Sequence, residues 1–298
     1  MTKLILKRLG KFALLIAVIL IPVVIIPQVY DPVGVRLLDD RYEIHKNLQC
    51  ANANCTRLRM PAGTITFAHG WRATIEADGR RLVPNNNPDC TLQVALIGDS
   101  YTWGPLVNDD ETWANGLAQH FPSACFYNYG MYGFNAEQVA LTLAEAVPDE
   151  MDMVLYFVFT NDDVGPIVNT HIGSPPSPLN IVLYVELIRQ HAGLREQAPG
   201  MIDFTPDPAQ FAAAIHRIGA DPRVQFVGFE HEIRLHEIRE MGYPATEIPW
   251  FSEDNIIAPI DNHPTAEGHR EIAQALFPLV REQLLLYNKQ QDVAPSDP

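Results

Sequence analysis

Residues of the kinds used in acyl transfer lie in four short polar blocks that are far apart along the chain. Ser100 lies in the first block, Gly133 in the second, Asn161 in the third and His263 in the fourth. A serine hydroxyl is a weak nucleophile until a base takes its proton, and histidine suits that task near neutral pH. Backbone N–H groups and a side-chain amide can stabilise the charge that develops on an attacked carbonyl oxygen. These residue types therefore indicate nucleophilic acyl chemistry, provided that the fold brings them together.

The first three blocks each follow an apolar run that is typical of a buried strand. Continuous apolar runs of this length predict strands covered on both faces, as in a parallel sheet. The predicted strands cover residues 92–97, 124–128, 154–159 and 224–229. The predicted helices cover residues 111–120, 136–146, 208–218 and 265–287. This alternation predicts an α/β fold with helices on both faces of the sheet and the polar blocks at its carboxyl edge.

In type and order, the four blocks resemble those of the SGNH (GDSL-type) hydrolase family. They are Gly98–Gly104 (GDSYTWG), Asn128–Gly133 (NYGMYG), Thr160–Asp162 (TND) and Asp261–Pro264 (DNHP). The resemblance spans about residues 92–286, and it implies a three-layer α/β/α sandwich with a central parallel sheet of the flavodoxin-like kind. It also implies an ester hydrolase that uses no metal and no organic cofactor.

The resemblance assigns a role to each candidate residue. Ser100 would be the nucleophile and His263 the base that activates it. The oxyanion hole would combine the backbone N–H groups of Ser100 and Gly133 with the side-chain amide of Asn161. Such a site would form an acyl ester of Ser100, which water would then hydrolyse.

The fourth block departs from the family pattern at the acidic residue. The usual Asp-x-x-His order would place a carboxylate at position 260, where this chain has Ile260. Asp261, two residues before His263, is the candidate that would orient the imidazole. Asp254, Glu253 or a Ser–His dyad without a third member are the alternatives.

Other polar residues near the blocks are interpreted as structural. Asp99 and Asp162 are expected to accept hydrogen bonds from nearby backbone amides. His269 is expected on the solvated face of a helix. The run Glu230–Glu232 and the nearby His236 lack the His-Glu-x-x-His spacing, so they are interpreted as a charged helix surface and not as a metal site.

The composition excludes several classes of protein. Apolar residues make up 47% and charged residues 19%, which is an ordinary globular mixture. The formal net charge is −15, from 21 basic and 36 acidic side chains. Because such a surface repels phosphate backbones and no basic stripe opposes it, we expect no binding to nucleic acid.

Residues 1–30 are predicted to be a short cytoplasmic stub and a transmembrane anchor. Residues 12–26 carry no charge and follow a basic segment, while acidic residues come after them. This asymmetry places the N-terminus inside and the rest of the chain outside the cytoplasm. A cleaved secretion signal is the alternative, although no small-x-small cleavage site follows the run. Both interpretations place the domain outside the cytoplasm, in the periplasm or at the cell surface.

Three further segments follow from the pattern of the remaining sequence. Residues 31–90 are predicted to be an irregular N-terminal extension of short strands and loops. Residues 91–288 would form the hydrolase domain, with residues 163–207 as a partly proline-rich insertion above the sheet. Residues 289–298 are predicted to be a disordered tail.

The four cysteines favour disulfides over a metal site. They are Cys50, Cys55, Cys90 and Cys125, an even number in a chain that is predicted to be exported. Three pairings are possible, one of which closes a small loop between Cys50 and Cys55. Zinc is the weaker interpretation, because no second ligand pair stands at a matching distance.

Together these observations predict a membrane-anchored serine esterase outside the cytoplasm. Its substrate would be an acyl ester, with O-acetyl esters included, of a glycan or lipid of the cell envelope. One alternative is a glycan O-acyltransferase that uses the same acyl-serine. The other is a non-catalytic envelope-binding module on the same scaffold.

Overall fold

The computed structural model describes residues 37–164, 206–258 and 261–293, together with residues 25, 26, 28–30, 180, 182, 184 and 185. The segment predicted to cross the membrane, residues 12–26, lies almost entirely outside this range, and so does most of the insertion 163–207. Within the described residues, no helix combines the length and apolar character that a membrane crossing needs.

A parallel sheet forms the centre of the molecule, with five strands in the described part of the chain. They are β5 (Leu92–Gly98), β6 (Ala124–Asn128), β7 (Met153–Phe157), β8 (Val224–Phe229) and β9 (Ala245–Ile248). Their spatial order is β6-β5-β7-β8-β9. The strand prediction is confirmed for β5 to β8. The chain changes direction across the sheet between β6 and β7, and ligands of such sheets bind at this switch point.

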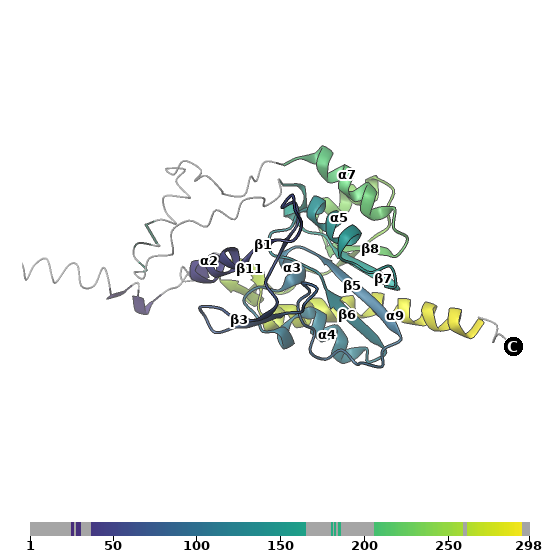
Figure 1. The fold of residues 1–298 in the computed structure, drawn as a ribbon, viewed down its shortest axis with the longest axis horizontal. Helices are drawn as coiled ribbons and strands as arrows, with labels where there is room; N and C mark the ends of the chain where they lie inside the picture. The colour runs from purple at the N-terminus through teal and green to yellow at the C-terminus, as the bar shows by residue number, and fades with distance from the viewer. Residues whose placement is uncertain are drawn as a thin grey trace, which may run out of the picture.

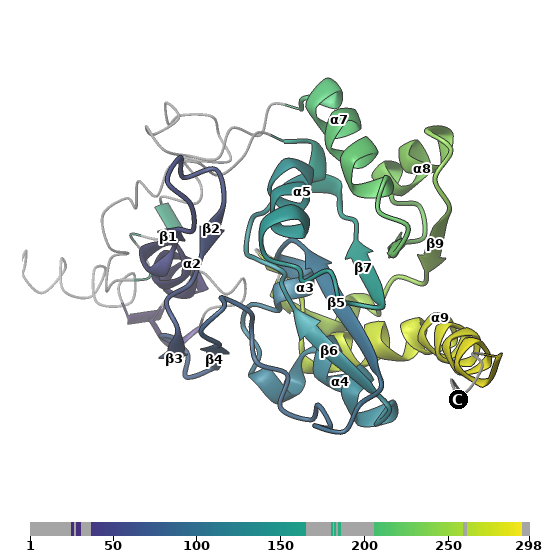
Figure 2. The same ribbon diagram turned by 45° about the vertical axis from the view of Figure 1, so that its right-hand side comes forward.

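Helices cover both faces of the sheet, which confirms the predicted three-layer arrangement (Figures 1 and 2). Alternate residues of β7 point to opposite faces, as the geometry of a strand requires. Val154 and Tyr156 belong to one hydrophobic cluster, with residues of α5 (Ala136–Glu145), α7 (Pro208–Gly219) and α8 (Ile233–Glu240). Leu155 and Phe157 belong to a second cluster, with residues of α4 (Trp113–His120) and α9 (Ala266–Val293).

The last helix is longer than the sequence predicts. α9 continues past Tyr287 to Val293, so the first part of the expected disordered tail is helical. Pro278 lies inside α9, where a proline removes one backbone hydrogen bond. Residues 294–298 lie outside the described range.

The N-terminal extension contains one helix and two small hairpins. The helix α2 (Leu37–Asn47) precedes the strands β1 (Gln49–Cys50) and β2 (Leu58–Arg59), which pair with each other. The strands β3 (Gly63–Thr66) and β4 (Arg72–Ile75) form the second antiparallel pair. The expectation of short strands and loops is thus confirmed for the hairpins, whereas α2 has no counterpart in the prediction.

A fully buried arginine connects the extension to the α/β domain. The Arg81 guanidinium lies 2.9 Å from the Asp109 carboxylate. It also donates hydrogen bonds to the backbone carbonyls of Trp103, the last residue of the short helix α3 (Ser100–Trp103), and of Gly104 and Val107 in the loop that follows. Because every donor direction of a guanidinium is fixed, these contacts define where the loop after α3 lies relative to the extension.

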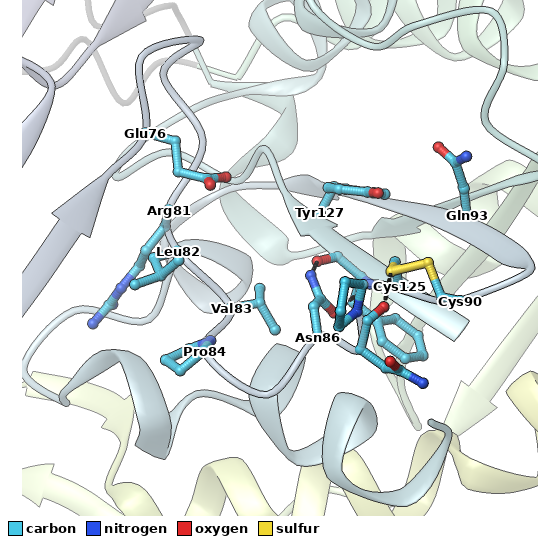
Figure 3. A pocket seen from close by; sticks show the side chains of 13 residues that line it. Glu76, Arg81, Leu82, Val83, Pro84, Asn86, Cys90, Gln93, Cys125 and Tyr127 are labelled. Atoms are coloured by element: carbon cyan, nitrogen blue, oxygen red, sulfur yellow. Dashed lines mark hydrogen bonds between the residues drawn. A yellow bond between two sulfur atoms is a disulfide. The ribbon is translucent and has the colours of Figure 1, made fainter. Parts of the chain in front are cut away.

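The last loop of the extension, which contains Asn86, lies along the outer edge of β6 (Figure 3). The Asn86 side chain accepts a hydrogen bond from the Phe126 backbone N–H at 2.8 Å and donates one to the Phe126 carbonyl at 2.7 Å. A polar groove of about 430 Å³ lies beside these contacts. No residue of the four sequence blocks lines this groove, so it is separate from the candidate site.

Both disulfides are formed, and they confirm the preferred interpretation of the cysteines. Cys50 pairs with Cys55 and closes the small loop within the extension. Cys90 pairs with Cys125 and joins the end of the extension to strand β6. Of the three possible pairings, the structure therefore selects the one with the short loop.

Candidate active site

Ser100 is the first residue of α3, at the turn that follows β5. Gly98, the last residue of β5, has a φ of 150°, and a Cβ there would lie 2.4 Å from Thr102 Oγ1. Only glycine fits this turn. Asp99 accepts a hydrogen bond from the Tyr101 backbone N–H at 2.8 Å and so caps α3, as the sequence analysis expects. The turn thereby holds the Ser100 hydroxyl at the carboxyl edge of the sheet.

His263 comes from a short hairpin that lies across this edge. Strand β11 (Asp261–Pro264) pairs with β10 (Ile256–Ala258). His263 Nε2 lies 2.7 Å from Ser100 Oγ, within hydrogen-bond distance. The Tyr101 hydroxyl donates to the Asn262 carbonyl at 2.9 Å, which ties the helix of the serine to the strand of the histidine. The two predicted partners are therefore in direct contact, although 163 positions separate them.

Asp261 contacts the other nitrogen of the His263 ring, as the sequence analysis predicts. Its Oδ1 lies 2.5 Å from His263 Nδ1 and also accepts a hydrogen bond from the His263 backbone N–H at 3.1 Å. The spacing of two residues works because both side chains lie on one side of β11, whereas Asn262 between them is exposed. The alternatives Asp254 and Glu253 lie in a short 3-10 helix, Glu253–Asn255, and are exposed.

The opposite oxygen of Asp261 binds an arginine from the extension. Arg41 of α2 donates to Asp261 Oδ2 from Nε at 3.2 Å and from Nη2 at 3.0 Å. Burial alone would raise the pKa of the Asp261 carboxyl. The hydrogen bond and charge of His263, together with the charge of Arg41, instead hold this pKa well below its usual range. Asp261 is therefore a carboxylate throughout the neutral range of pH.

Asp99 lies in a different electrostatic environment, although it is close to the same serine. Burial raises the pKa of its carboxyl to about 6, against the lowering effect of the Tyr101 N–H, the charge of His263 and a hydrogen bond from the Asn161 side chain. Ser100 Oγ lies 3.4 Å from Asp99 Oδ2. Asp162 accepts a hydrogen bond from the Phe159 backbone N–H at 2.8 Å, which confirms the structural interpretation of that residue.

The two other oxyanion candidates lie at the same edge. Asn161 belongs to a short 3-10 helix, Thr160–Asp163, directly after β7, and its side chain reaches Asp99 beside Ser100. Gly133 lies in the turn after β6 with a φ of 74°, a conformation that glycine adopts readily. Its neighbour Tyr132 has its ring 5.8 Å from the His263 ring. Their function as oxyanion donors stays a prediction, because the oxygen they would bind belongs to the substrate.

Aromatic rings extend from the triad along the carboxyl edge. The Tyr101 ring lies 5.4 Å from the His263 ring and stacks on Phe159 at 3.9 Å. Phe159 in turn stacks on Trp250 at 6.2 Å. Trp250 is 37% exposed, whereas Tyr101 and Phe159 are buried. Trp250 thus presents an apolar surface close to the triad that the sequence analysis does not identify.

The expectation for His269 is wrong. Its side chain is completely buried, and its Nδ1 accepts a hydrogen bond from the Trp113 backbone N–H at 3.3 Å. Burial, followed by the charges of Arg81 and His263, lowers the pKa of His269 to about 3. The helix that carries it packs against α4 at this point, and sequence polarity alone gives no sign of that contact.

Of the residues considered for metal binding, Glu230 and His231 are exposed in the turn before α8, not on a helix as predicted, and Glu232 is the half-buried N-cap of that helix. His236 is exposed on α8 and lies 3.2 Å from Glu240, one turn further along the helix. Within the described part of the chain, no group of three or more His, Cys, Asp or Glu side chains is arranged to hold a metal ion.

Comparisons with known proteins find similarity at the level of solved structures. No family model matches the chain, and no curated protein matches it. One similar structure is a lipolytic G-D-S-L family protein from Veillonella parvula, with 13% identity, 63% of this chain and 97% of that chain covered, and a TM-score of 0.39. TesA has 10% identity, coverage of 64% and 99%, and a TM-score of 0.42. A carbohydrate acetylesterase family member from Sinorhizobium meliloti has 17% identity, coverage of 65% and 99%, and a TM-score of 0.38.

The class of site follows from the contacts within this chain. A serine on a strand-to-helix turn, a histidine on its hydroxyl and a carboxylate on the other ring nitrogen form the triad of serine hydrolases. Here the triad lies at the carboxyl edge of a parallel α/β/α sandwich.

Proposed function

We propose that the protein is a serine esterase that works through an acyl ester of Ser100. The observation that carries this proposal is the continuous hydrogen-bonded series from Ser100 Oγ through the His263 ring to Asp261, with distances of 2.7 Å and 2.5 Å. Both contacts are made by buried side chains, so water does not compete for them. The series has the geometry required of a nucleophile, its general base and the group that orients the base.

The reaction would proceed in two halves. His263 Nε2 takes the proton of the Ser100 hydroxyl while Oγ attacks the ester carbonyl carbon. The tetrahedral intermediate then collapses, and His263 returns the proton to the departing alcohol, which leaves an acyl ester on Oγ. A water molecule then attacks the ester carbonyl carbon while His263 takes its proton. The bond between the acyl carbon and Oγ breaks, His263 returns the proton to Ser100 Oγ, and the carboxylic acid departs. Asp261 stays ionised and stabilises the imidazolium in both halves.

Three groups are proposed to stabilise the oxyanion. The backbone N–H groups of Ser100 and Gly133 and the Asn161 amide all come from the segments that follow β5, β6 and β7. These strands are neighbours at the switch point of the sheet, so their carboxyl ends converge on Ser100.

The substrate is proposed to be an acyl ester of a glycan or lipid outside the cytoplasm. Support comes from the charge-asymmetric apolar segment at residues 12–26 and from two disulfides, which persist in oxidising compartments. The N-terminal segment would then keep the enzyme at the membrane, close to envelope substrates. The proposed chemistry needs no metal and no organic cofactor.

The test measures p-nitrophenol release from acetyl and butyryl esters by the full-length chain in detergent. Ser100→Ala should lower turnover at least about 10³-fold, while Ser123→Ala, in an exposed turn, should leave it unchanged. Equal turnover by the parent and Ser100→Ala would refute the esterase. Acyl-Ser100 that is consumed by an added glycan, and not by water, would identify the acyltransferase instead. A folded parent without any acyl-Ser100 would favour the binding module.

A further inference from the structure

We propose that helix α2 of the N-terminal extension is part of the catalytic apparatus, with Arg41 as a positioning residue for Asp261. The inference rests on the proposed esterase function and adds to it a group outside the α/β domain. Arg41 touches neither Ser100 nor the reacting atoms, so it would act through the carboxylate that orients His263.

The contacts of Asp261 divide its two oxygens between two partners. Oδ1 faces the His263 ring, and Oδ2 accepts both hydrogen bonds from Arg41. A carboxylate that is held at one oxygen alone can rotate about its bond to Cβ. Held at both, it presents Oδ1 to the imidazole in one orientation. Arg41 thereby fixes the direction of the His263 Nδ1 hydrogen bond and, through the ring, of Nε2 toward Ser100.

The residue before Arg41 holds the helix in place. The Asp40 carboxylate is completely buried, and it accepts hydrogen bonds from the His69 backbone N–H and the Trp71 indole N–H, both at 3.2 Å. It also pairs with the His69 ring. His69 and Trp71 flank the turn between β3 and β4, so α2 is docked on that hairpin. Successive residues point about 100° apart around a helix, so a helix docked through Asp40 is free to present Arg41 to the neighbouring site.

A second contact of α2 reaches the ring beside the base. His45 lies four residues after Arg41 and therefore on the same side of the helix. Its ring lies 5.5 Å from the Tyr132 ring in an edge-to-face arrangement, and Tyr132 lies 5.8 Å from the His263 ring. Burial, together with the charge of Arg41, lowers the pKa of His45. One side of α2 thus contacts both the acid and the aromatic neighbour of the base.

Arg41 also contributes a charge to the site. Its guanidinium opposes a second positive charge on the neighbouring imidazole, so its removal makes protonation of the Asp261–His263 pair easier. The acidic limb of the pH profile of kcat/KM should then move to higher pH. The other groups that face this pair are Ser100, Asp99 and Tyr101 from the β5–α3 turn and helix, Tyr132 from the turn after β6, and His269 from α9. None of these groups changes in the Arg41 and Lys46 variants proposed below.

A merely structural role for Arg41 predicts a different outcome. The Asp261 carboxylate that it contacts is only 1% exposed, so removal of Arg41 leaves a buried charge with fewer partners. A merely structural Arg41 would therefore lower the melting temperature on removal and leave kcat and the pH profile unchanged. A positioning role instead predicts a loss in turnover, because small displacements of a catalytic group are costly for the rate.

The experiment compares Arg41→Gln, Arg41→Lys and the control Lys46→Gln, which removes an exposed charge from the same helix. The full-length chain is assayed with p-nitrophenyl acetate across pH 5 to 9. We expect Arg41→Gln to lower kcat about 10-fold with little change in KM, and to shift the acidic limb upward. Arg41→Lys should restore part of kcat and the position of the limb, and Lys46→Gln should match the parent.

A double-mutant cycle completes the test. In an Asp261→Asn background, Arg41→Gln should change turnover by less than about twofold, because the carboxylate that Arg41 positions is gone. The proposal would be overturned if Arg41→Gln and Arg41→Lys had the same turnover and pH profile as the parent. It would also be overturned if Arg41→Gln lowered turnover by the same factor in the parent and in the Asp261→Asn background. Activity of the parent that survives Ser100→Ala would instead overturn the esterase function itself, so the two failures are distinguishable.

Discussion

The α/β domain and the N-terminal extension both bury apolar side chains, but they differ in how far their positions depend on buried charged groups. The central strands β5 and β7 are almost entirely apolar, and their residues pack into two hydrophobic clusters. In the extension, by contrast, two of the principal anchors are buried charged side chains. Asp40 fixes α2 to the β3–β4 hairpin, and Arg81 fixes the extension to the loop after α3.

This difference affects how accurately each part is positioned. Hydrophobic burial stabilises strongly but has no preferred direction, so it fixes layers better than it fixes single side chains. Hydrogen bonds to buried charged groups are directional and are lost as a whole when one partner is removed. The extension is therefore precisely oriented at two places. Arg41 of α2 contacts Asp261, and Arg81 contacts the end of α3 and the loop after it.

The strongest test of the comparison removes the anchor at Arg81. Arg81→Met removes the cation that pairs with the Asp109 carboxylate and the buried donor of the Trp103 and Val107 backbone carbonyls. We expect the free energy of unfolding to fall by about 3–5 kcal/mol, measured by urea denaturation.

Arg72→Met provides the control, because Arg72 is an exposed arginine on the adjacent strand β4. Its effect should stay within about 0.5 kcal/mol. Equal stabilities of the two variants would show that the extension is held by its apolar contacts and not by its buried charge.

A variant at the carboxyl edge of the α/β domain should lower activity and leave stability almost unchanged. Asn161→Ala removes a proposed oxyanion donor and should lower kcat by about 10²–10³-fold with little change in KM. Folding should be almost unaffected, because the side chain is only partly buried. Thr160→Ala, at the exposed neighbouring position, should retain parental kinetics. An effect of Asn161→Ala on KM alone would reassign the residue to substrate binding.

The smallest expected effect comes from the disulfide within the extension. The Cys50–Cys55 bond spans only five positions, so paired replacement by alanine should lower stability by about 2 kcal/mol. The expected readout is a modest fall in melting temperature with unchanged kcat. A loss of activity instead would mean that this loop also supports α2 and the triad.

The α/β domain could be predicted from the sequence because its signals are local. Apolar runs such as residues 92–97 identify buried strands, and the polar residues at their ends identify the edge where chemistry occurs. Asp261 follows the same logic once residues 261–264 are recognised as a strand, since residues two apart then share a side. β9 escapes prediction because it is an edge strand whose residues are mostly exposed.

The contribution of the extension could not be predicted, because its signals are not local. The sequence of α2, LLDDRYEIHKN, is too polar to indicate a helix that packs against a catalytic site. The pair of Arg41 and Asp261 is separated by 220 positions. The prediction for His269 is wrong for the same reason. A histidine near a helix start is expected to be solvated, and it is the packing of α4 against α9 that buries it.

The contacts of Asn86 have a consequence for how this protein behaves at high concentration. An edge strand with free N–H and C=O groups can recruit a strand from another molecule, and this pairing is a common start of aggregation. At β6 the Asn86 side chain satisfies both backbone groups of Phe126, as a partner strand would. The disulfide from Cys90 to Cys125, the residue before Phe126, keeps that loop on the edge when the surrounding structure fluctuates. This side of the sheet is therefore closed to intermolecular strand addition at its centre.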